Sequence, residues 1–525
     1  MTGGSRSRRA IESAPIEGKV VDSVERYLAS YDDFEFTDSQ VAERFSADAL
    51  VGSYCWVGEL GWLAWDSRRW RDIPNPVMLG VVRNWVKSEY VRTAGLIGEA
   101  REIGNKDAVG RLRYIHGQWY NYQSAGKLGA VARLSQPDVV HRLSEFDAKP
   151  DLLNVRNGVI NLSTGELMPH DPALMLTQLA DVDYKPGATH KDWAMALEAI
   201  PEDLQGWFQL RCGQSITGYK PDDDAVIVEH GGGANGKNTI MEAYGKTLGD
   251  YFKMASPRVL LGNPDQHPTE LADLYAARMV WLDELPEGRY LPATRIKNLT
   301  AGQLPARKIG KDPLVLEVLF SLFVSTNYLP AVNETDEGTW RRLFLLRFPY
   351  QFRKPGQPGY KPGDASLRQR VKRGRGQREA ILAWLVEGAQ MWYANDREFP
   401  KPDPVIIEDD RIWWRKRDDS IWRFIDEQLE FDSDAHVMSK DLFQQFTLWQ
   451  AAQNQKPWGD RTFVERLTGN EIIAEHNVFP KKGVRKRAGS GLSRPDGVVS
   501  LAMIPEQYNA WFGLRFKEPA ITFEY

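Results

Sequence analysis

Apolar residues follow two different spacings along the chain. Helical spacing over residues 78–101 predicts a long helix, whereas short apolar runs without alternation occur at 225–228, 277–282, 319–324 and 343–346. Such runs are typical of strands buried on both faces, and helical stretches separate these four. We therefore expect an α/β fold with a parallel sheet covered by helices in the middle of the chain.

Turn signals and apolar periodicity place further elements around this region. A short hairpin is expected at 61–70. Another is expected at 151–167, where two short apolar runs flank Asn-Gly and Thr-Gly turns. Helices are expected at 190–213, 240–248 and 378–393. The tryptophan-rich stretch from 40 to 145 is interpreted as a packed core rather than a base-stacking surface.

The first of the four apolar runs leads into a glycine-rich loop of the form G-x-x-x-x-G-K, followed by a predicted helix. Its residues are Gly231, Gly232, Gly233, Ala234, Asn235, Gly236, Lys237, Asn238 and Thr239. Glycines let consecutive N–H groups point inward, the helix N-terminus adds positive potential, and the lysine reaches the β- and γ-phosphates. The residue after the lysine is normally a Ser or Thr that coordinates magnesium, but it is Asn238 here. The magnesium ligand is therefore expected to be either Thr239, in a shifted register, or Asn238.

Polar residues end the later apolar runs. Asp283 and Glu284 follow the second run, as expected for a magnesium-holding acid and an acid that orients the attacking water. Asn327 ends the third run and is placed near the γ-phosphate. Arg341 and Arg342 precede the fourth run, and they are interpreted either as catalytic arginines or as a surface ion-pair cluster.

In this order, the motifs resemble those of superfamily 3 helicases of the AAA+ class. Residues 296–311 and 151–172 resemble elements of phage and plasmid primase-helicases related to the poxvirus replication ATPase. The resemblance covers about 150–395, although a Gly-Asp pair of the family is Gly302-Gln303 here. Residues 1–20 contain Gly, Ser and Arg and are expected to be disordered. We expect three domains after them: an α+β collar-like domain (21–190), a P-loop ATPase domain (191–395) and a small C-terminal domain (410–525).

The resemblance also implies a hexameric ring with ATP and Mg²⁺ bound between subunits. Thr239 and Asp283 would hold the metal, and Arg342, with Arg341 beside it, would reach the neighbouring subunit's nucleotide. A hairpin carrying Arg307, Lys308 and Lys311 would contact single-stranded DNA in the central channel.

The last hundred residues read as helix, helix and basic hairpin. Helices are expected at 438–449 and 461–467, and the hairpin carries Lys481, Lys482, Arg485, Lys486 and Arg487. This order suggests a winged helix whose basic wing holds DNA, and the alternative is a solvated run of charges.

Charge and composition limit the remaining classes. The 525 residues carry 67 Lys plus Arg against 71 Asp plus Glu, a net charge of −4. Residues 351–378 nevertheless hold nine basic residues and one acid, and residues 481–494 hold six basic residues and no acid, so a nucleic-acid partner remains compatible. Two cysteines exclude a disulfide framework and favour a reducing cytoplasm, here that of a bacterial host. No apolar run approaches the ~18 residues that a membrane span needs.

These observations predict an ATP-dependent DNA helicase of a phage, plasmid or integrated element, acting as a ring on single-stranded and forked DNA. The alternative is a DNA- or origin-binding ATPase ring in which ATP controls assembly without processive unwinding. A protein-remodelling ATPase fits the basic segments less well, and a DNA-packaging ATPase would usually carry a nuclease carboxylate cluster, which the sequence does not show. Primer synthesis is not expected from this chain, because residues 1–150 contain no clear D-x-D carboxylate pair. A primase, a polymerase or a loader is the expected kind of protein partner.

Overall fold

The computed structural model describes most of the chain, in two compact units. The described residues are 14–262, 268–287, 290–307, 313–332, 337–353, 361–453, 456–485, 491–495 and 503–517. Unit 1 comprises residues 1–149, 169–178 and 308–313, and unit 2 comprises the rest.

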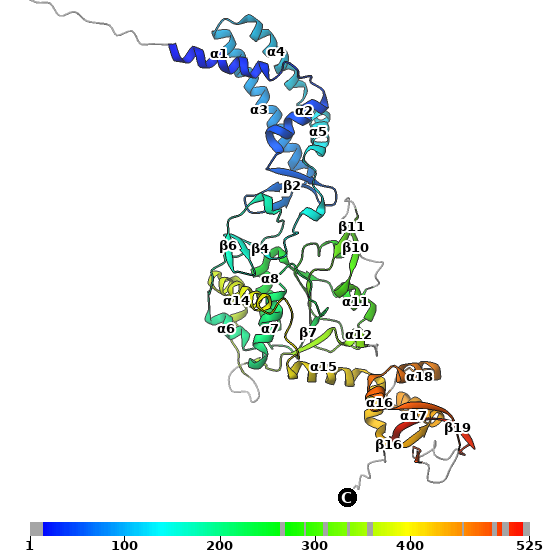
Figure 1. Ribbon diagram of the computed structural model, residues 1–525. Coiled ribbons are helices and arrows are strands. Elements are labelled where there is room, and N and C mark those ends of the chain that lie inside the picture. Colours follow the sequence, from blue (N-terminus) through cyan, green and yellow to red (C-terminus); the bar gives the residue numbers. More distant parts are fainter. Residues whose placement is uncertain are drawn as a thin grey trace, which may run out of the picture. The chain divides into compact units, whose positions relative to one another are not determined.

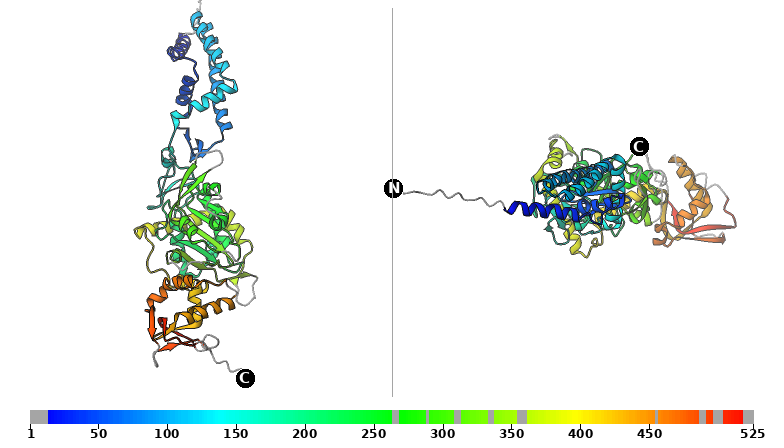
Figure 2. Two further views of the ribbon diagram at one scale, coloured as in Figure 1. Left: turned by 90° about the vertical axis from the view of Figure 1, so that its right-hand side faces the viewer. Right: turned by 90° about the horizontal axis from the view of Figure 1, so that it is seen from above.

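Unit 1 is mainly helical. Its elements are α1 (Ala14–Ala29), α2 (Asp38–Phe45), a π-helical turn (Ser46–Leu50), β1 (Tyr54–Val57), β2 (Gly61–Trp65), β3 (Trp70–Asp72), α3 (Asn75–Glu102), α4 (Lys106–Asn121) and α5 (Ala125–Leu134). The strands form a small antiparallel sheet, and α3 and α4 run side by side (Figures 1 and 2). Trp62, Trp70 and Trp119 are buried, which agrees with the interpretation of this region as a packed core.

Unit 2 is built on a five-stranded parallel sheet in the order β13-β7-β12-β9-β8. The strands are β7 (Val226–His230), β8 (Phe252–Ala255), β9 (Met279–Leu282), β12 (Ser321–Thr326) and β13 (Leu343–Arg347). All residues of β9 and β12 are buried, as their unalternating apolar sequences predict. The expected α/β fold with a parallel sheet is confirmed.

Helices and short strands surround this sheet. They are β4 (Leu152–Val155), β5 (Gly158–Asn161), β6 (Glu166–Met168), α6 (Lys191–Leu197), α7 (Glu202–Gln214), α8 (Lys237–Leu248), α9 (Arg258–Leu261), α10 (Pro268–Ala272), α11 (Ala293–Ala301), β10 (Gln303–Arg307), β11 (Pro313–Glu317), α12 (Glu337–Trp340), β14 (Phe352–Arg353), β15 (Lys361–Pro362), α13 (Leu367–Arg373), α14 (Arg375–Ala394) and α15 (Val405–Asp418). Helices α7 and α14 pack against each other (Figure 1), so closely that a Cβ on Gly213 would lie 2.1 Å from the carbonyl carbon of Gly388.

The C-terminal part of unit 2 has its own core and sheet. Its elements are α16 (Ser420–Gln428), β16 (Leu429–Met438), α17 (Ser439–Ala452), α18 (Asp460–Thr468), α19 (Glu471–Glu475), β17 (Phe479–Arg485), β18 (Leu492–Ser493) and β19 (Gln507–Phe516). The strand order is β17-β19-β16-β18, and β17 pairs antiparallel with β19. The expected helices at 438–449 and 461–467 correspond to α17 and α18.

Three expectations differ from the structure. Residues 14–20, expected within a disordered N-terminus of 1–20, belong to α1, whose later residues Val24 and Leu28 are buried. The helix expected at 190–213 is two helices, because Pro201 lacks a backbone N–H and disfavours the helical conformation of the residue before it. The strands β4 to β6, assigned from the sequence to an N-terminal domain ending at 190, belong to unit 2, where Leu153 of β4 and Ile160 of β5 pack in the core with Ile227.

Among the described residues, no helix is long and apolar enough to cross a membrane.

Candidate nucleotide site

The glycine-rich loop connects β7 to α8 with the backbone conformation that its sequence predicts. Gly233, Ala234 and Gly236 have φ values of 87°, 50° and 96°, in the left-handed region that glycine adopts most readily. Gly231 has little room for a side chain, since a Cβ there would lie 2.8 Å from the carbonyl oxygen of Phe348. The loop therefore curls tightly and ends at the amino terminus of a twelve-residue helix, the arrangement that binds phosphate in many proteins.

Lys237 is the first residue of α8 and is 3% exposed. Its Nζ donates to the carbonyl oxygen of Gly231 at 2.6 Å and to the side-chain oxygens of Asn327 at 3.3 Å and Asn235 at 3.4 Å. Burial lowers the pKa of the Lys237 ammonium, and the nearby carboxylates of unit 2 oppose that shift. The loop thus holds a buried cation at its centre, where an anionic phosphate would be stabilised.

The two acids after β9 occupy different positions. Asp283 is half-buried, and burial together with the Glu284 carboxylate raises its pKa, while a hydrogen bond from the Asn238 side chain opposes the shift. Glu284 has a φ of 51°, which is uncommon for a residue with a side chain and typical of functional sites. Its carboxylate Oε1 accepts a hydrogen bond from Asn327 Nδ2 at 3.2 Å.

The parallel register explains why these residues meet. Val324 of β12 lies beside Val228 of β7 and Leu282 of β9, so all three strands end at the same edge of the sheet. The phosphate loop, the acids and Asn327 follow these three ends. Asn238 and Thr239 are the two residues expected to serve magnesium. The side chain of Asn238 hydrogen-bonds to Asp283, whereas Thr239 lines a neighbouring cavity.

A buried polar cluster lies behind the loop. Glu229 of β7 is fully buried and accepts a hydrogen bond from Ser325 Oγ at 2.6 Å, and Ser325 in turn accepts one from Trp281 Nε1 at 2.9 Å. Burial raises the pKa of Glu229 to about 7. The sequence analysis did not single out this carboxyl. Its signal in the sequence is a lone acid, Glu229, that directly follows the apolar run Ala225–Val228.

The neighbouring cavity has a volume of about 230 Å³ and opens beside the loop. Its lining residues include Ala234, Gly236 and Thr239 from the loop and helix, with Phe352, Leu367 and Arg368 from β14 and α13. The cavity is partly apolar and adjoins the glycine-rich loop. This is the position that a nucleoside would take if its phosphates lay in the loop. The sequence predicted the loop residues among these, but not Phe352, Leu367 and Arg368, because they come from segments with no local motif.

Arg341 and Arg342 lie at the opposite edge of the sheet from the phosphate loop. Strand β13 is parallel to β7, with Leu343 beside Val226 and Arg347 beside His230. The arginines precede β13 and therefore lie at the amino ends of the strands, about 15 Å of strand length away from the loop. Neither can serve the phosphate loop of its own chain without rearrangement.

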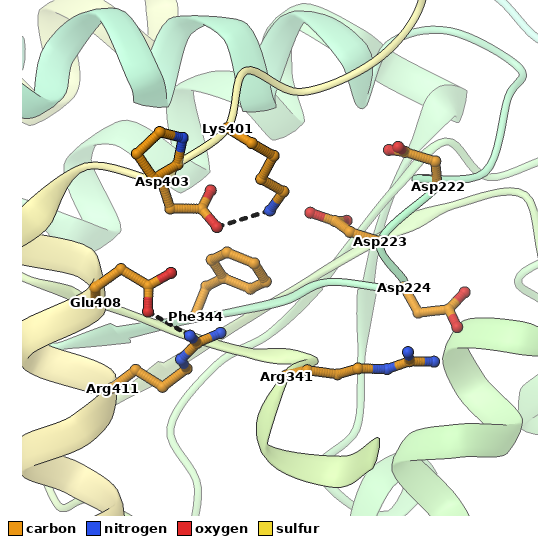
Figure 3. A pocket seen from close by; sticks show the side chains of 10 residues that line it. Asp222, Asp223, Asp224, Arg341, Phe344, Lys401, Asp403, Glu408 and Arg411 are labelled. Carbon is orange, nitrogen blue, oxygen red and sulfur yellow. Dashed lines mark hydrogen bonds and ion pairs between the residues drawn. The ribbon is translucent and has the colours of Figure 1, made fainter. Parts of the chain in front are cut away.

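The two arginines have different surroundings. Arg342 is 8% exposed and pairs with Asp224 at 2.7 Å, so its guanidinium is held inside the chain. Arg341 is exposed and lines a cavity of about 310 Å³ together with Asp222, Asp223 and Asp224 (Figure 3). The guanidinium available to a second molecule is that of Arg341.

The basic stretch at 351–378 is largely neutralised within unit 2. Arg368 and Lys372 pair with Glu242, and Arg370 pairs with Asp192 at 2.9 Å. Arg375 and Arg378 pair with further acids of the unit. Five of the nine basic residues of this stretch are therefore ion-paired where α13 and α14 pack in unit 2.

The expected DNA contacts are only partly described. Arg307 lies at the end of the exposed face of β10, and Lys481, Lys482 and Arg485 lie on the exposed strand β17. Lys308, Lys311, Lys486 and Arg487 lie outside the described residues. Among the described residues, no group of three or more His, Cys, Asp or Glu side chains could hold a metal by itself.

Comparison with known proteins adds two family matches. Residues 42–201 match a family model described as "D5 N terminal like", and residues 230–342 match a family of unknown function numbered 5906. The second match spans the phosphate loop, the acids after β9, Asn327 and both arginines.

Several viral proteins are among the relatives of this chain. A mimivirus protein named as a helicase (L207/L206, Acanthamoeba polyphaga mimivirus) is 24% identical over 421 residues, which cover 74% of this chain and 43% of the relative. A protein of African swine fever virus (strain Badajoz 1971 Vero-adapted) named as a primase (C962R) is 25% identical over 308 residues, 55% of this chain and 32% of the relative. A protein of Frog virus 3 named as a helicase (022R) is 26% identical over 317 residues, 58% of this chain and 31% of the relative.

The chain therefore spans less than half the length of these curated relatives. Among solved structures, the apo C-terminal region of NrS-1 aligns with a TM-score of 0.44 and 10% identity, covering 85% of this chain and 88% of that chain.

Proposed function

Because the chain belongs to the phage-type primase-helicase family, we propose that it is an ATP-dependent DNA helicase of the superfamily 3 AAA+ type. The observation that carries the proposal is the meeting of Lys237, Glu284 and Asn327 at one sheet edge, joined by hydrogen bonds. A buried lysine, an acid and an amide in this arrangement serve phosphoryl transfer from a nucleoside triphosphate to water.

Each group has a role that follows from its contacts. Lys237 and the loop N–H groups bind the β- and γ-phosphates, and the cavity beside the loop takes the nucleoside. Glu284 polarises the attacking water, and Asn327 holds the Glu284 carboxylate in place. Asp283, with Asn238 hydrogen-bonded to it, is the residue that would hold Mg²⁺; the metal supplies charge neutralisation of the phosphates when bound.

Assembly completes the site. Arg341 lies at the far edge of the sheet from its own loop, so it acts on the nucleotide of a neighbouring subunit in a ring. Arginine suits this role because its planar guanidinium stays charged and can stabilise the negative charge of the transferring phosphoryl group. Arg342 supports this edge through its ion pair with Asp224.

Two features favour DNA as the substrate. Arg307 lies on the exposed face at the end of β10, close in sequence to Lys308 and Lys311. The C-terminal elements follow the order helix, strand, three helices and three strands, which includes the helix, strand, helix, helix, strand, strand order of a winged helix. In that arrangement β17, with Lys481, Lys482 and Arg485, leads into the wing and contacts phosphates.

The test replaces the loop lysine. Lys237→Ala should abolish both ATP hydrolysis and unwinding of a forked DNA by the purified protein. Lys246→Ala is the matched control, because Lys246 is an exposed lysine on the same helix α8. Full hydrolysis by Lys237→Ala would contradict the proposed nucleotide site.

The same assays separate the alternative function. A ring in which ATP controls DNA binding without strand separation would hydrolyse or bind ATP and retain DNA while leaving the fork intact. Native mass measurement with ATP and single-stranded DNA reports the expected hexamer independently.

A further inference from the structure

The helical hairpin of α3 and α4 in unit 1 has a basic face that the nucleotide site does not use. On α3, Arg83, Lys87 and Arg101 recur at intervals that place them on one side of the helix with Tyr90. On α4, Lys106 and Arg113 share a side with His116 and Tyr120. All five cations are exposed.

Ring contacts show that the two sides adjoin. Tyr90 stacks on His116 with centroids 4.0 Å apart and an angle of 21° between the planes, and it lies 6.2 Å from the ring of Tyr120. His116 Nδ1 is also 3.0 Å from Thr93 Oγ1 of α3. Because Tyr90 and His116 belong to the two basic stripes, the stripes run side by side and form one face.

Several other cations of unit 1 differ from those of this face because they are ion-paired. Arg26, Arg44, Arg69, Arg92, Arg111 and Lys127 each form an ion pair with an acid. No ion pair within the described part of the chain involves the five cations of the hairpin face. Neither stripe contains an acidic residue between Arg83 and Tyr120, since Glu89, Glu99, Glu102 and Asp107 occupy other sides of the helices.

We propose that this face of the α3–α4 hairpin binds single-stranded DNA. Five unpaired cations along about 27 Å of helix match the repeated phosphates of a nucleic-acid backbone. Tyr120, 66% exposed at the end of the aromatic stack, offers a ring on which an unpaired base can stack. Stacking requires an unpaired base, which favours a single strand over a duplex. The proposal is independent of the nucleotide site, because it concerns a different unit of the chain.

The test is DNA binding by the full-length protein. The triple variant Arg83→Ala, Lys87→Ala and Arg113→Ala should bind a fluorescent oligothymidine at least about tenfold more weakly at low salt. Its dependence of log affinity on log salt should be shallower by about 2, since each lost phosphate contact on a single strand removes ~0.7. Tyr120→Ala should weaken binding several-fold without changing the salt dependence, because stacking involves no counterion release.

The matched control removes three exposed cations of unit 1 that lie outside the stripes: Arg71, Arg133 and Lys149 to alanine. It has the same net charge, so equal losses in the two triple variants would reject the proposal in favour of nonspecific attraction. Unchanged affinity in the hairpin variant would reject it as well, and a larger loss for duplex than for single-stranded DNA would reject the choice of ligand. Retained ATP hydrolysis and an unchanged circular dichroism spectrum verify that each variant is folded.

Discussion

The Glu284 carboxylate accepts a hydrogen bond from the side-chain amide of Asn327 at 3.2 Å. The same amide group uses its oxygen to accept a hydrogen bond from Lys237 Nζ at 3.3 Å. Asn327 thus connects the proposed water-polarising acid to the proposed phosphate-binding lysine. A change at either partner is transmitted to the other through one planar group.

Replacing Glu284 by glutamine should separate nucleotide binding from hydrolysis. The amide retains the size of the side chain but cannot polarise water, so the hydrolysis rate should fall by 10² to 10⁴-fold, the usual contribution of general-base catalysis. Binding of a fluorescent ATP analogue should change by less than about threefold. Steady-state hydrolysis and equilibrium binding measure the two effects. Glu287→Gln, a nearby acid beyond the site, is the control; an equal loss there would remove Glu284 from the proposed role.

The adjacent arginines should give opposite phenotypes. Arg342→Ala breaks a buried ion pair with Asp224 and should lower the free energy of unfolding by roughly 3 kcal/mol, seen as a lower thermal midpoint. Arg341→Ala should leave the thermal midpoint unchanged and lower ATP hydrolysis at least about a hundredfold. Mixing Arg341→Ala with Lys237→Ala should restore part of the activity, because some neighbouring pairs then combine an intact loop with an intact arginine. No recovery in the mixture would argue against a site shared between subunits.

Stability should depend on pH through Glu229. Folding raises the pKa of this buried carboxyl from 4.5 to about 7, so ionisation disfavours the native state. Stability contributed by the protonated group is complete below about pH 4.5, declines as the pH rises towards 7, and then stays low, a difference of roughly 3 kcal/mol. Glu229→Gln keeps an acceptor for Ser325 and should therefore be more stable than the parent protein at pH 8 and similar to it at pH 5. Urea unfolding at both values checks this, with exposed Glu202→Gln expected to show no such difference.

The sheet and the phosphate loop were predictable because their signals are local. Unalternating apolar runs gave four of the five strands, and a glycine-rich loop placed between the first strand and a helix gave the position of Lys237. Spacing alone also brought Asp283, Glu284 and Asn327 to one edge, since parallel strands end together. These interpretations needed only the sequence and the geometry of a parallel sheet.

Other parts depend on contacts between distant segments. The sequence could not distinguish Arg341 from Arg342, because the difference is the ion pair that Asp224 forms across more than a hundred residues. It could not show that five of the basic residues of 351–378 are ion-paired, because their acidic partners include residues at 181–192, at 242 and at 379. The cavity beside the loop likewise joins residues from 195 to 368.

The division of the chain between the two units affects how fragments can be made. The chain leaves unit 1 after Lys149 and returns to it for residues 169–178, where Pro172 and Leu176 accept hydrogen bonds from the indole and backbone N–H of Trp70. A fragment ending at residue 149 would lose the segment 169–178 and leave the two N–H groups of Trp70 without these carbonyl acceptors. Excision of unit 1 by a single truncation therefore produces a damaged domain, and a useful fragment must extend at least to residue 178.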